Sequence, residues 1–190
     1  MGTLRTAMVA AACALGTAAT AIAQEATVRT YPVTGTTYAE LIASMRENGP
    51  FVERTGQRHY GITETGFRQE WSYQQAQGRC ELLDARTELE LTIVLPEWVD
   101  REGASASTRR RWDRIRKDIA QHERQHAEIA REYLAKLRAE TDRPVSAPTC
   151  AALEAGLRAR SQIIIDRHRE AQAAFDRRVR SPTIDNPRAG

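Results

Sequence analysis

The clearest strand pattern in the chain lies between Arg79 and Leu95. Apolar residues alternate there with mostly polar ones, which predicts one buried face and one solvated face. The predicted buried face consists of Leu89, Leu91, Ile93 and Leu95. Residues 59–74 are rich in aromatic and β-branched residues and predict a second long strand, joined to the first by a turn at residues 75–79. A shorter run at residues 26–33 contains a proline near its end and is typical of an edge strand.

Apolar residues at spacings of three and four predict two long helices in the second half of the chain. The first covers residues 105–139, with a serine or threonine at 105, 107 or 108 as its cap. Its predicted buried stripe consists of Trp112, Ile115, Ile119, His122, His126, Ile129, Tyr133 and Leu137. The second covers residues 149–178, and its predicted stripe consists of Leu153, Leu157, Ile164, His168, Ala171 and Phe175. A short helix capped by Thr36 or Thr37 is predicted to end at residues 48–50.

The predicted order is strand, short helix, long hairpin and two long helices, which indicates an α+β domain. We expect an antiparallel sheet of about three strands, packed on the short helix and the two long C-terminal helices in a zincin-like arrangement. This single domain is predicted to cover residues 24–180. The tail at residues 181–190 has two prolines and little apolar content, so we expect it to be disordered.

The first 23 residues have the pattern of a secretory signal peptide. Arg5 precedes a run of apolar and small residues, which ends in Ala21-Ile22-Ala23, an A-x-A cleavage signature. We expect cleavage after Ala23 and a periplasmic or secreted protein without stable membrane insertion; an uncleaved membrane anchor is the alternative. Loss of Arg5 leaves 27 of the 28 basic residues against 25 acidic ones. This nearly neutral, interspersed charge does not indicate a nucleic acid or a membrane surface as partner.

Two cysteines, Cys80 and Cys150, remain after the predicted cleavage. In an oxidising compartment an even number of cysteines predicts a disulfide, here between the strand region and the last helix. Such a bond would close a loop of about 70 residues, which the loop-entropy relation equates with about 4 kcal/mol of stabilisation. The alternative is that the two thiolates are metal ligands.

The sequence from His122 to His126 has the pattern H-E-x-x-H within the first long helix. Two histidines four residues apart lie one above the other on a helix face and can share one metal ion. Glu123 can then act as the general base toward a zinc-activated water that attacks a carbonyl. This arrangement is typical of zinc hydrolases, and of metallopeptidases in particular. The alternative is a pair of hydrogen-bonded core histidines with a surface glutamate.

A catalytic zinc ion needs a third protein ligand and one open position. In the metzincin pattern a glycine and a third histidine would stand at Ile129 and Glu132, so that solution does not apply. A thermolysin-like solution takes the ligand from a following helix, where the candidates are Glu154, Asp166, His168 and Glu170. His168 is the preferred candidate because it lies on the apolar stripe, and Glu170 is the alternative. His168 can equally be a core histidine bonded to a neighbour.

Several short motifs in order resemble those of bacterial predicted secreted zinc-dependent proteases, a family known as a domain of unknown function. The likeness covers residues 31–176. The matching pieces are Tyr31-Pro32-Val33-Thr34-Gly35, Gly49-Pro50, His59-Tyr60-Gly61-Ile62-Thr63, Trp71-Ser72-Tyr73, Cys80, Leu95-Pro96-Glu97-Trp98, Trp112 and the H-E-x-x-H motif. The resemblance implies zinc, a periplasmic or secreted location and protease activity.

The C-terminal motif of this family departs from the pattern in one place. Many members end in Tyr-Asp-x-x-Thr-x-His-Gly, and Phe175 and Asp176 match its first two residues. Ser181 stands where the histidine would be. If that histidine completes the site in other members, this chain must use another group or bind zinc poorly.

We therefore expect a periplasmic or secreted zinc metallopeptidase that acts on a peptide or protein substrate. In this hypothesis Zn²⁺ is bound by His122, His126 and a third ligand, and Glu123 is the base. The competing hypothesis is a non-catalytic envelope protein of the same fold, with a structural metal or none, that acts in binding or assembly.

Overall fold

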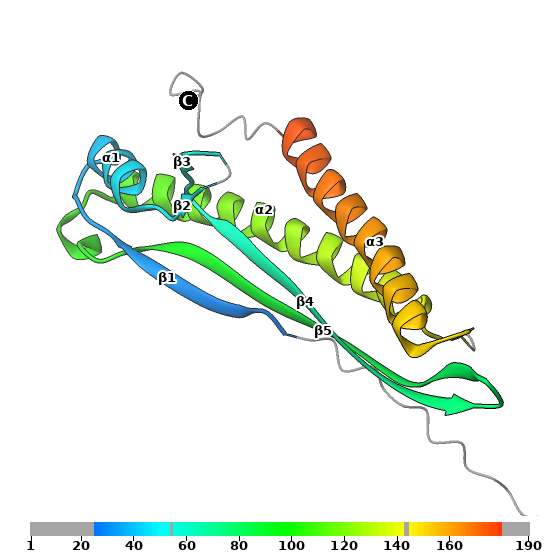
Figure 1. The fold of residues 1–190 in the computed structure, drawn as a ribbon. Helices are drawn as coiled ribbons and strands as arrows, with labels where there is room; N and C mark the ends of the chain where they lie inside the picture. The colour runs from blue at the N-terminus through cyan, green and yellow to red at the C-terminus, as the bar shows by residue number, and fades with distance from the viewer. Residues whose placement is uncertain (1–24, 54, 143–144, 180–190) are drawn as a thin grey trace, which may run out of the picture.

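The structure, a computed structural model, describes residues 25–53, 55–142 and 145–179. The predicted signal peptide and the predicted disordered tail lie outside the described residues. The described part of the chain is an α+β fold in which helices cover one face of a sheet (Figure 1). The fold class predicted from the sequence is confirmed at this level.

The main sheet has four strands: β1, β5 and β4 lie side by side in that order, and a two-residue strand, β6 (Ser146–Ala147), pairs with β5. The three long strands are β1 (Thr27–Val33), β4 (Ile62–Ala76) and β5 (Arg79–Trp98). β4 and β5 form the predicted antiparallel hairpin, but β1 runs parallel to β5. The sheet is therefore mixed, and the prediction of an antiparallel sheet was wrong for β1. The reason is that the chain between β1 and β4 crosses over through a helix, so β1 pairs with the far strand of the hairpin.

The three α-helices begin and end close to the predicted positions. They are α1 (Tyr38–Asn48), α2 (Ala106–Ala139) and α3 (Cys150–Arg178). Thr37, Ser105 and Thr149 cap them, each accepting a hydrogen bond from a backbone N–H of the first turn. The sequence did not predict four short elements: β2 (Phe51–Val52), β3 (Gln57–Arg58), β6 (Ser146–Ala147) and the 3₁₀ helix η1 (Arg101–Gly103).

The core lies between the hairpin and α2, which runs along one face of the sheet (Figure 1). The predicted inward-facing residues of β5 are all buried: Leu89, Leu91, Ile93 and Leu95. α3 packs against both α2 and the hairpin. Its start is tied to β5 by the disulfide between Cys80 and Cys150. None of the described helices is both long and apolar enough to span a membrane.

The buried stripe of α2 differs from the predicted one in its second half. Trp112, Ile115 and Ile119 are buried as predicted. Beyond them, Leu137 is also buried as predicted, but the other buried residues are Ala120, Glu123, Ala127, Ala130 and Leu134. His122 and His126 are instead partly exposed and lie toward Phe175 of α3. Spacings of three and four fit both stripes, and the packing of α2 between a sheet and a second helix decides between them.

Candidate metal centre

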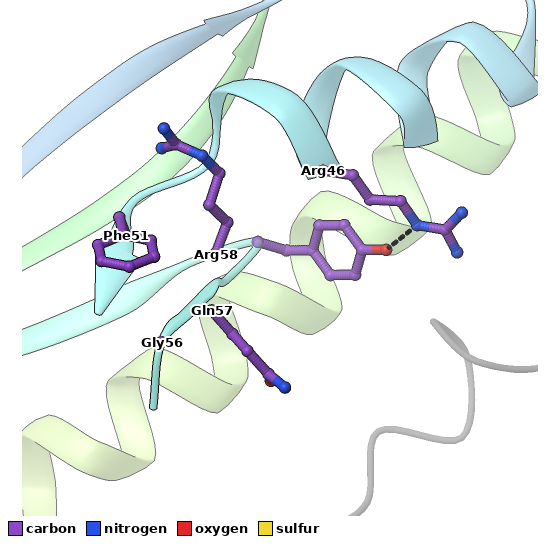
Figure 2. Close-up of a pocket in the computed structure, with 6 residues that line it drawn as sticks. Arg46, Phe51, Gly56, Gln57 and Arg58 are labelled. Carbon is purple, nitrogen blue, oxygen red and sulfur yellow. Dashed lines mark hydrogen bonds between the residues drawn. The ribbon is translucent and has the colours of Figure 1, made fainter. Parts of the chain in front are cut away.

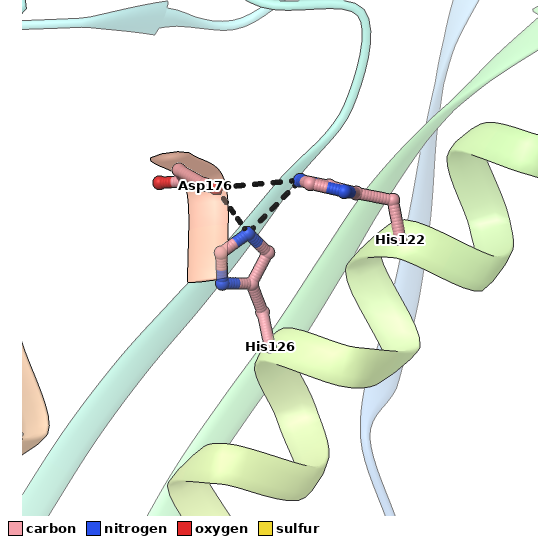
Figure 3. Close-up of side chains that lie close together, drawn as sticks. All are labelled: His122, His126 and Asp176. Atoms are coloured by element: carbon pink, nitrogen blue, oxygen red, sulfur yellow. Dashed lines mark hydrogen bonds and ion pairs between the residues drawn. The ribbon is translucent and has the colours of Figure 1, made fainter. Parts of the chain in front are cut away.

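α2 and α3 bring three potential metal ligands together, two from the H-E-x-x-H motif and one from the end of α3 (Figure 3). The Nε2 atoms of His122 and His126 lie 3.1 Å apart. Oδ1 of Asp176 lies 2.9 Å from Nε2 of His126 and 3.4 Å from Nε2 of His122. Among the residues that the structure describes, these form the one group of His, Cys, Asp or Glu side chains close enough to share a metal ion.

The spacing of the three donor atoms fits a small metal ion. Zinc binds histidine nitrogen and carboxylate oxygen at about 2.0–2.2 Å, so neighbouring ligand atoms of a tetrahedral site stand about 3.3–3.6 Å apart. The observed separations of 2.9, 3.1 and 3.4 Å lie within this range or slightly below it. Two imidazole nitrogens and a carboxylate oxygen are also donors that zinc commonly takes. The residues present therefore fit a metal ion of this kind.

The exposure of the three ligands differs, and this leaves one side of the group open. The side chain of His126 is 12% exposed and that of His122 25% exposed, whereas that of Asp176 is 50% exposed. A structural zinc site is closed by four protein ligands, and a catalytic one keeps a position for water or substrate. The group has three donor side chains, one fewer than a closed structural site.

Gln172 hydrogen-bonds to His126 on the side of the ring opposite to the group, at Nδ1. Its Oε1 lies at hydrogen-bond distance from Nδ1 of His126, and its Nε2 donates to the backbone oxygen of His126 at 3.1 Å. Histidine ligands of metals usually donate their second ring N–H in this way, which fixes the tautomer and the ring orientation. The Nε2 atom of His126 is thereby left free to face the group.

His122 is held differently. In the described part of the chain, its buried Nδ1 has no hydrogen-bond partner. The ring packs instead on that of Phe175, with centroids 4.9 Å apart. Burial and the neighbouring His126 lower the pKa of His122, while Asp176 opposes this effect. The neutral form of the imidazole, which a metal requires, is favoured by these surroundings.

Glu123 of α2 is buried next to the group and packs against the start of β4. Its side chain is 5% exposed, and Thr63 lies 2.9 Å from both its Oε2 and its backbone oxygen. Gly61 makes this close approach possible, because a Cβ atom there would lie 3.2 Å from Oε1 of Glu123 and 2.7 Å from Cγ2 of Ile119. Burial raises the pKa of Glu123, and the hydrogen bond from Thr63 partly offsets the rise.

The third member of the group differs from the predicted ligands. His168 is buried and lies outside the group, with its Nε2 2.8 Å from Nε2 of Gln172. Glu170 is exposed on α3 and is not part of the group either. Two further candidates from the sequence form pairs with arginines of α3, namely Glu154 with Arg158 and Asp166 with Arg169.

The sequence contains a signal for Asp176 beside the one that favours His168. Asp176 follows Phe175, the last residue of the predicted apolar stripe of α3, and the two match a Tyr-Asp pair of the resembling family. The apolar stripe itself does not include Asp176. The angle between α3 and α2 brings the end of α3 over the two histidines (Figures 1 and 3), and the sequence does not specify that angle.

A hollow of about 560 Å³ lies between the end of α1 and the β2–β3 hairpin (Figure 2). It is lined by Arg46, Phe51, Gly56, Gln57, Arg58 and Tyr60. Nε of Arg46 donates to the hydroxyl of Tyr60 at 3.1 Å. Tyr60 directly precedes Gly61, so the wall of the hollow is one residue from the contact with Glu123. None of the six lining residues belongs to the His122, His126 and Asp176 group, so the hollow is not part of it.

The fold and the site thus define an α+β protein with a candidate His/His/Asp metal group between two helices. Residues 28–181 match the family described as "Bacterial protein of unknown function (DUF922)", and the chain belongs to this family. No curated protein matches the chain. No solved structure matches it either. Because the family has no assigned function, the zinc and protease parts of the resemblance stay predictions.

Proposed function

We propose that this chain is a zinc-dependent metallopeptidase with a zincin-like fold. The observation that carries the proposal is the convergence of His122, His126 and Asp176 on one point, with a solvent-facing side and with Glu123 buried beside them. Two histidines and one carboxylate are also the donor set of thermolysin-type zinc peptidases, which use glutamate in place of aspartate.

A bound zinc ion would supply a Lewis acid that polarises a peptide carbonyl and lowers the pKa of a water molecule. The side chains of the protein would transfer the protons. Glu123 takes the proton of the attacking water and returns it to the leaving amine. Its raised pKa suits a group that must both accept and release a proton near neutral pH. The hydroxyl of Thr63 donates to Oε2 of Glu123 and so holds the carboxylate in place.

We also propose that the protein works outside the cytoplasm, in the periplasm or as a secreted enzyme. The A-x-A signature at residues 21–23 supports export. The disulfide between Cys80 and Cys150 supports an oxidising compartment, because such bonds rarely persist where thiols are kept reduced. The substrate is then a peptide or protein of the cell envelope or its surroundings.

Metal content and peptidase activity of purified residues 24–190 test the proposal. We expect one zinc ion per chain and hydrolysis of an unstructured protein such as casein. Glu123→Gln should keep the zinc and lose the activity, because it removes the base and spares the ligands. Asp176→Asn should bind zinc at least about 10–100-fold more weakly, as loss of even a supporting group does. Asp166→Asn, an exposed aspartate of the same helix, is the matched control.

The competing hypothesis of a non-catalytic envelope protein predicts no peptidase activity, with or without bound zinc. A chain that binds no zinc after dialysis against the metal contradicts the metallopeptidase. So does equal activity of the parent chain and Glu123→Gln, because any measured hydrolysis would then come from a contaminant. Stoichiometric zinc without activity toward casein or a mixed peptide library would favour a structural metal and sink the enzymatic role.

A further inference from the structure

The side-chain amide of Gln172 bridges two histidines on different helices. Its Oε1 lies at hydrogen-bond distance from Nδ1 of His126 on α2. Its Nε2 lies 3.1 Å from the backbone oxygen of His126 and 2.8 Å from Nε2 of His168 on α3. All three contacts use the polar ends of one amide group, so they restrict one another.

One backbone atom fixes the donor and acceptor roles of all the groups that hydrogen-bond to Gln172. The carbonyl oxygen of His126 can only accept a hydrogen bond, so the NH₂ end of Gln172 must face it. The amide oxygen then faces Nδ1 of His126, which must carry the proton and donate it. The second proton of the NH₂ group points to Nε2 of His168, which must accept.

We infer that Gln172 is a positioning residue of the metal centre and that His168 is its support. By accepting from Nδ1–H, Gln172 leaves the lone pair of His126 on Nε2, aimed at His122 and Asp176. Because Nε2 of His168 accepts a hydrogen bond from the NH₂ group of Gln172, it prevents a 180° flip of the amide. This inference rests on the proposed metal site, and it gives His168 a role other than that of a ligand.

The surroundings of His168 suit this supporting role. The ring of His168 is buried and stands edge-on to those of Phe67 from β4 and Tyr133 from α2, with centroids 5.1 and 5.5 Å away. Two aromatic rings from different elements thus restrain its orientation. Burial lowers the pKa of His168, and a neutral ring is the form that can accept from an amide. Through these contacts the sheet holds the ring of a candidate ligand on α2.

Zinc affinity, measured by competition with a chelator, tests the role of Gln172. We expect Gln172→Leu to weaken zinc binding by about 10–100-fold, the loss typical when a supporting partner of a histidine ligand is removed. Gln172→Glu keeps an acceptor for Nδ1–H, so its affinity should lie closer to that of the parent chain than to that of Gln172→Leu. Gln162→Leu changes an exposed glutamine of the same helix and should bind zinc like the parent.

A second measurement works without metal. Nitrogen-15 NMR of the zinc-free chain at mildly alkaline pH reports which ring nitrogen of His168 carries the proton. We expect the proton on Nδ1 and a bare Nε2 in the parent chain, and a redistribution in Gln172→Leu. Thermal unfolding of the zinc-free variants shows whether each is folded.

The outcomes separate this inference from the proposed function. Zinc binding by the parent chain that Gln172→Leu leaves unchanged overturns the positioning role and spares the metallopeptidase. A proton on Nε2 of His168 also overturns it, with or without metal. A parent chain that binds no zinc overturns the proposed function and, with it, the metal-positioning role of Gln172.

Discussion

Asp176 would contribute the one negative charge among the three proposed ligands, because both imidazoles bind a metal in their neutral form. A zinc ion held by this set would keep a net charge of about +1, the same as in the His₂Glu sites of known zinc peptidases. The half-exposed carboxylate is the least restrained of the three side chains. By contrast, Gln172 anchors His126, and the ring of Phe175 packs on His122. The affinity of the site should therefore depend on how firmly α3 holds Asp176 in place.

Gly61 is a second residue on which the site depends, because its lack of a side chain leaves space for the side chain of Glu123. In Gly61→Ala the new methyl group would lie 2.7 Å from Cγ2 of Ile119 and 3.2 Å from Oε1 of Glu123. We expect a loss of about 1–3 kcal/mol in the free energy of unfolding, the usual cost of overpacking. Urea unfolding measures it.

Gly156→Ala is the matched control for this change. Gly156 lies in α3, and no heavy atom is near the position of its missing Cβ. Alanine in a helix interior should raise the stability there by up to about 1 kcal/mol. Equal effects of the two substitutions would contradict the close approach of Gly61 to Glu123.

Among the elements, α1 has the most complete local stop and start signals. Thr37 accepts from the backbone N–H of Glu40, and the carboxylate of Glu40 accepts in return from the N–H groups of Thr36 and Thr37. This capping box satisfies donors that the first helical turn leaves free. It explains why the start of α1 could be predicted from the sequence.

The capping box also makes the free energy of unfolding depend on pH in the acidic range. The hydrogen bonds from Thr36 and Thr37 lower the pKa of Glu40 in the folded chain. A carboxylate with a lowered pKa stabilises the fold above its ordinary pKa, and this contribution is lost as the pH falls through the folded value. Glu40→Gln should therefore flatten the acid side of a plot of urea midpoint against pH. Glu47→Gln, exposed in the last turn of the same helix, is the control and should keep the parent curve.

The disulfide joins the hairpin to the start of α3, and α3 carries Asp176 near its other end. Its loop spans 70 residues. We expect the double substitution Cys80→Ser and Cys150→Ser to cost about 4 kcal/mol of unfolding free energy, from the entropy that the closed loop removes from the unfolded chain. Denaturant unfolding of the parent chain with and without a reductant gives the same comparison. No change in the midpoint on reduction would contradict a stabilising bond.

Across the whole molecule, a bound zinc ion would link α2 to α3 and so couple metal binding to global stability. A ligand at a hundred times its dissociation constant stabilises the folded state by about 2.7 kcal/mol. For a domain of this size we expect a rise of about 5–10 °C in the melting temperature, reversed by a chelator. Differential scanning calorimetry measures it. The same rise in Asp176→Asn would show that zinc binds elsewhere and would contradict the site.

The helices and the hairpin could be predicted because their signals are local. Threonine and serine caps, apolar spacing and alternation act within a few residues, so Thr37 and Ser105, each one of the caps that the sequence offered, begin α1 and α2. The pairing of the two candidate histidines followed in the same way from the pitch of one helix. The cysteine pair was predictable from compartment and number alone, and Cys80 and Cys150 are indeed bonded.

Tertiary packing alone decided three features. They are the parallel pairing of β1, the burial of Glu123 and the position of Asp176 beside the two histidines. Each depends on which surfaces meet: β1 could have joined either hairpin strand, α2 could have buried either of two stripes, and α3 could have crossed α2 at another angle. Local spacing constrains neighbours along one element. The third member of the metal group comes from another helix, 50 residues beyond His126 in the numbering, and only the tertiary packing sets their distance.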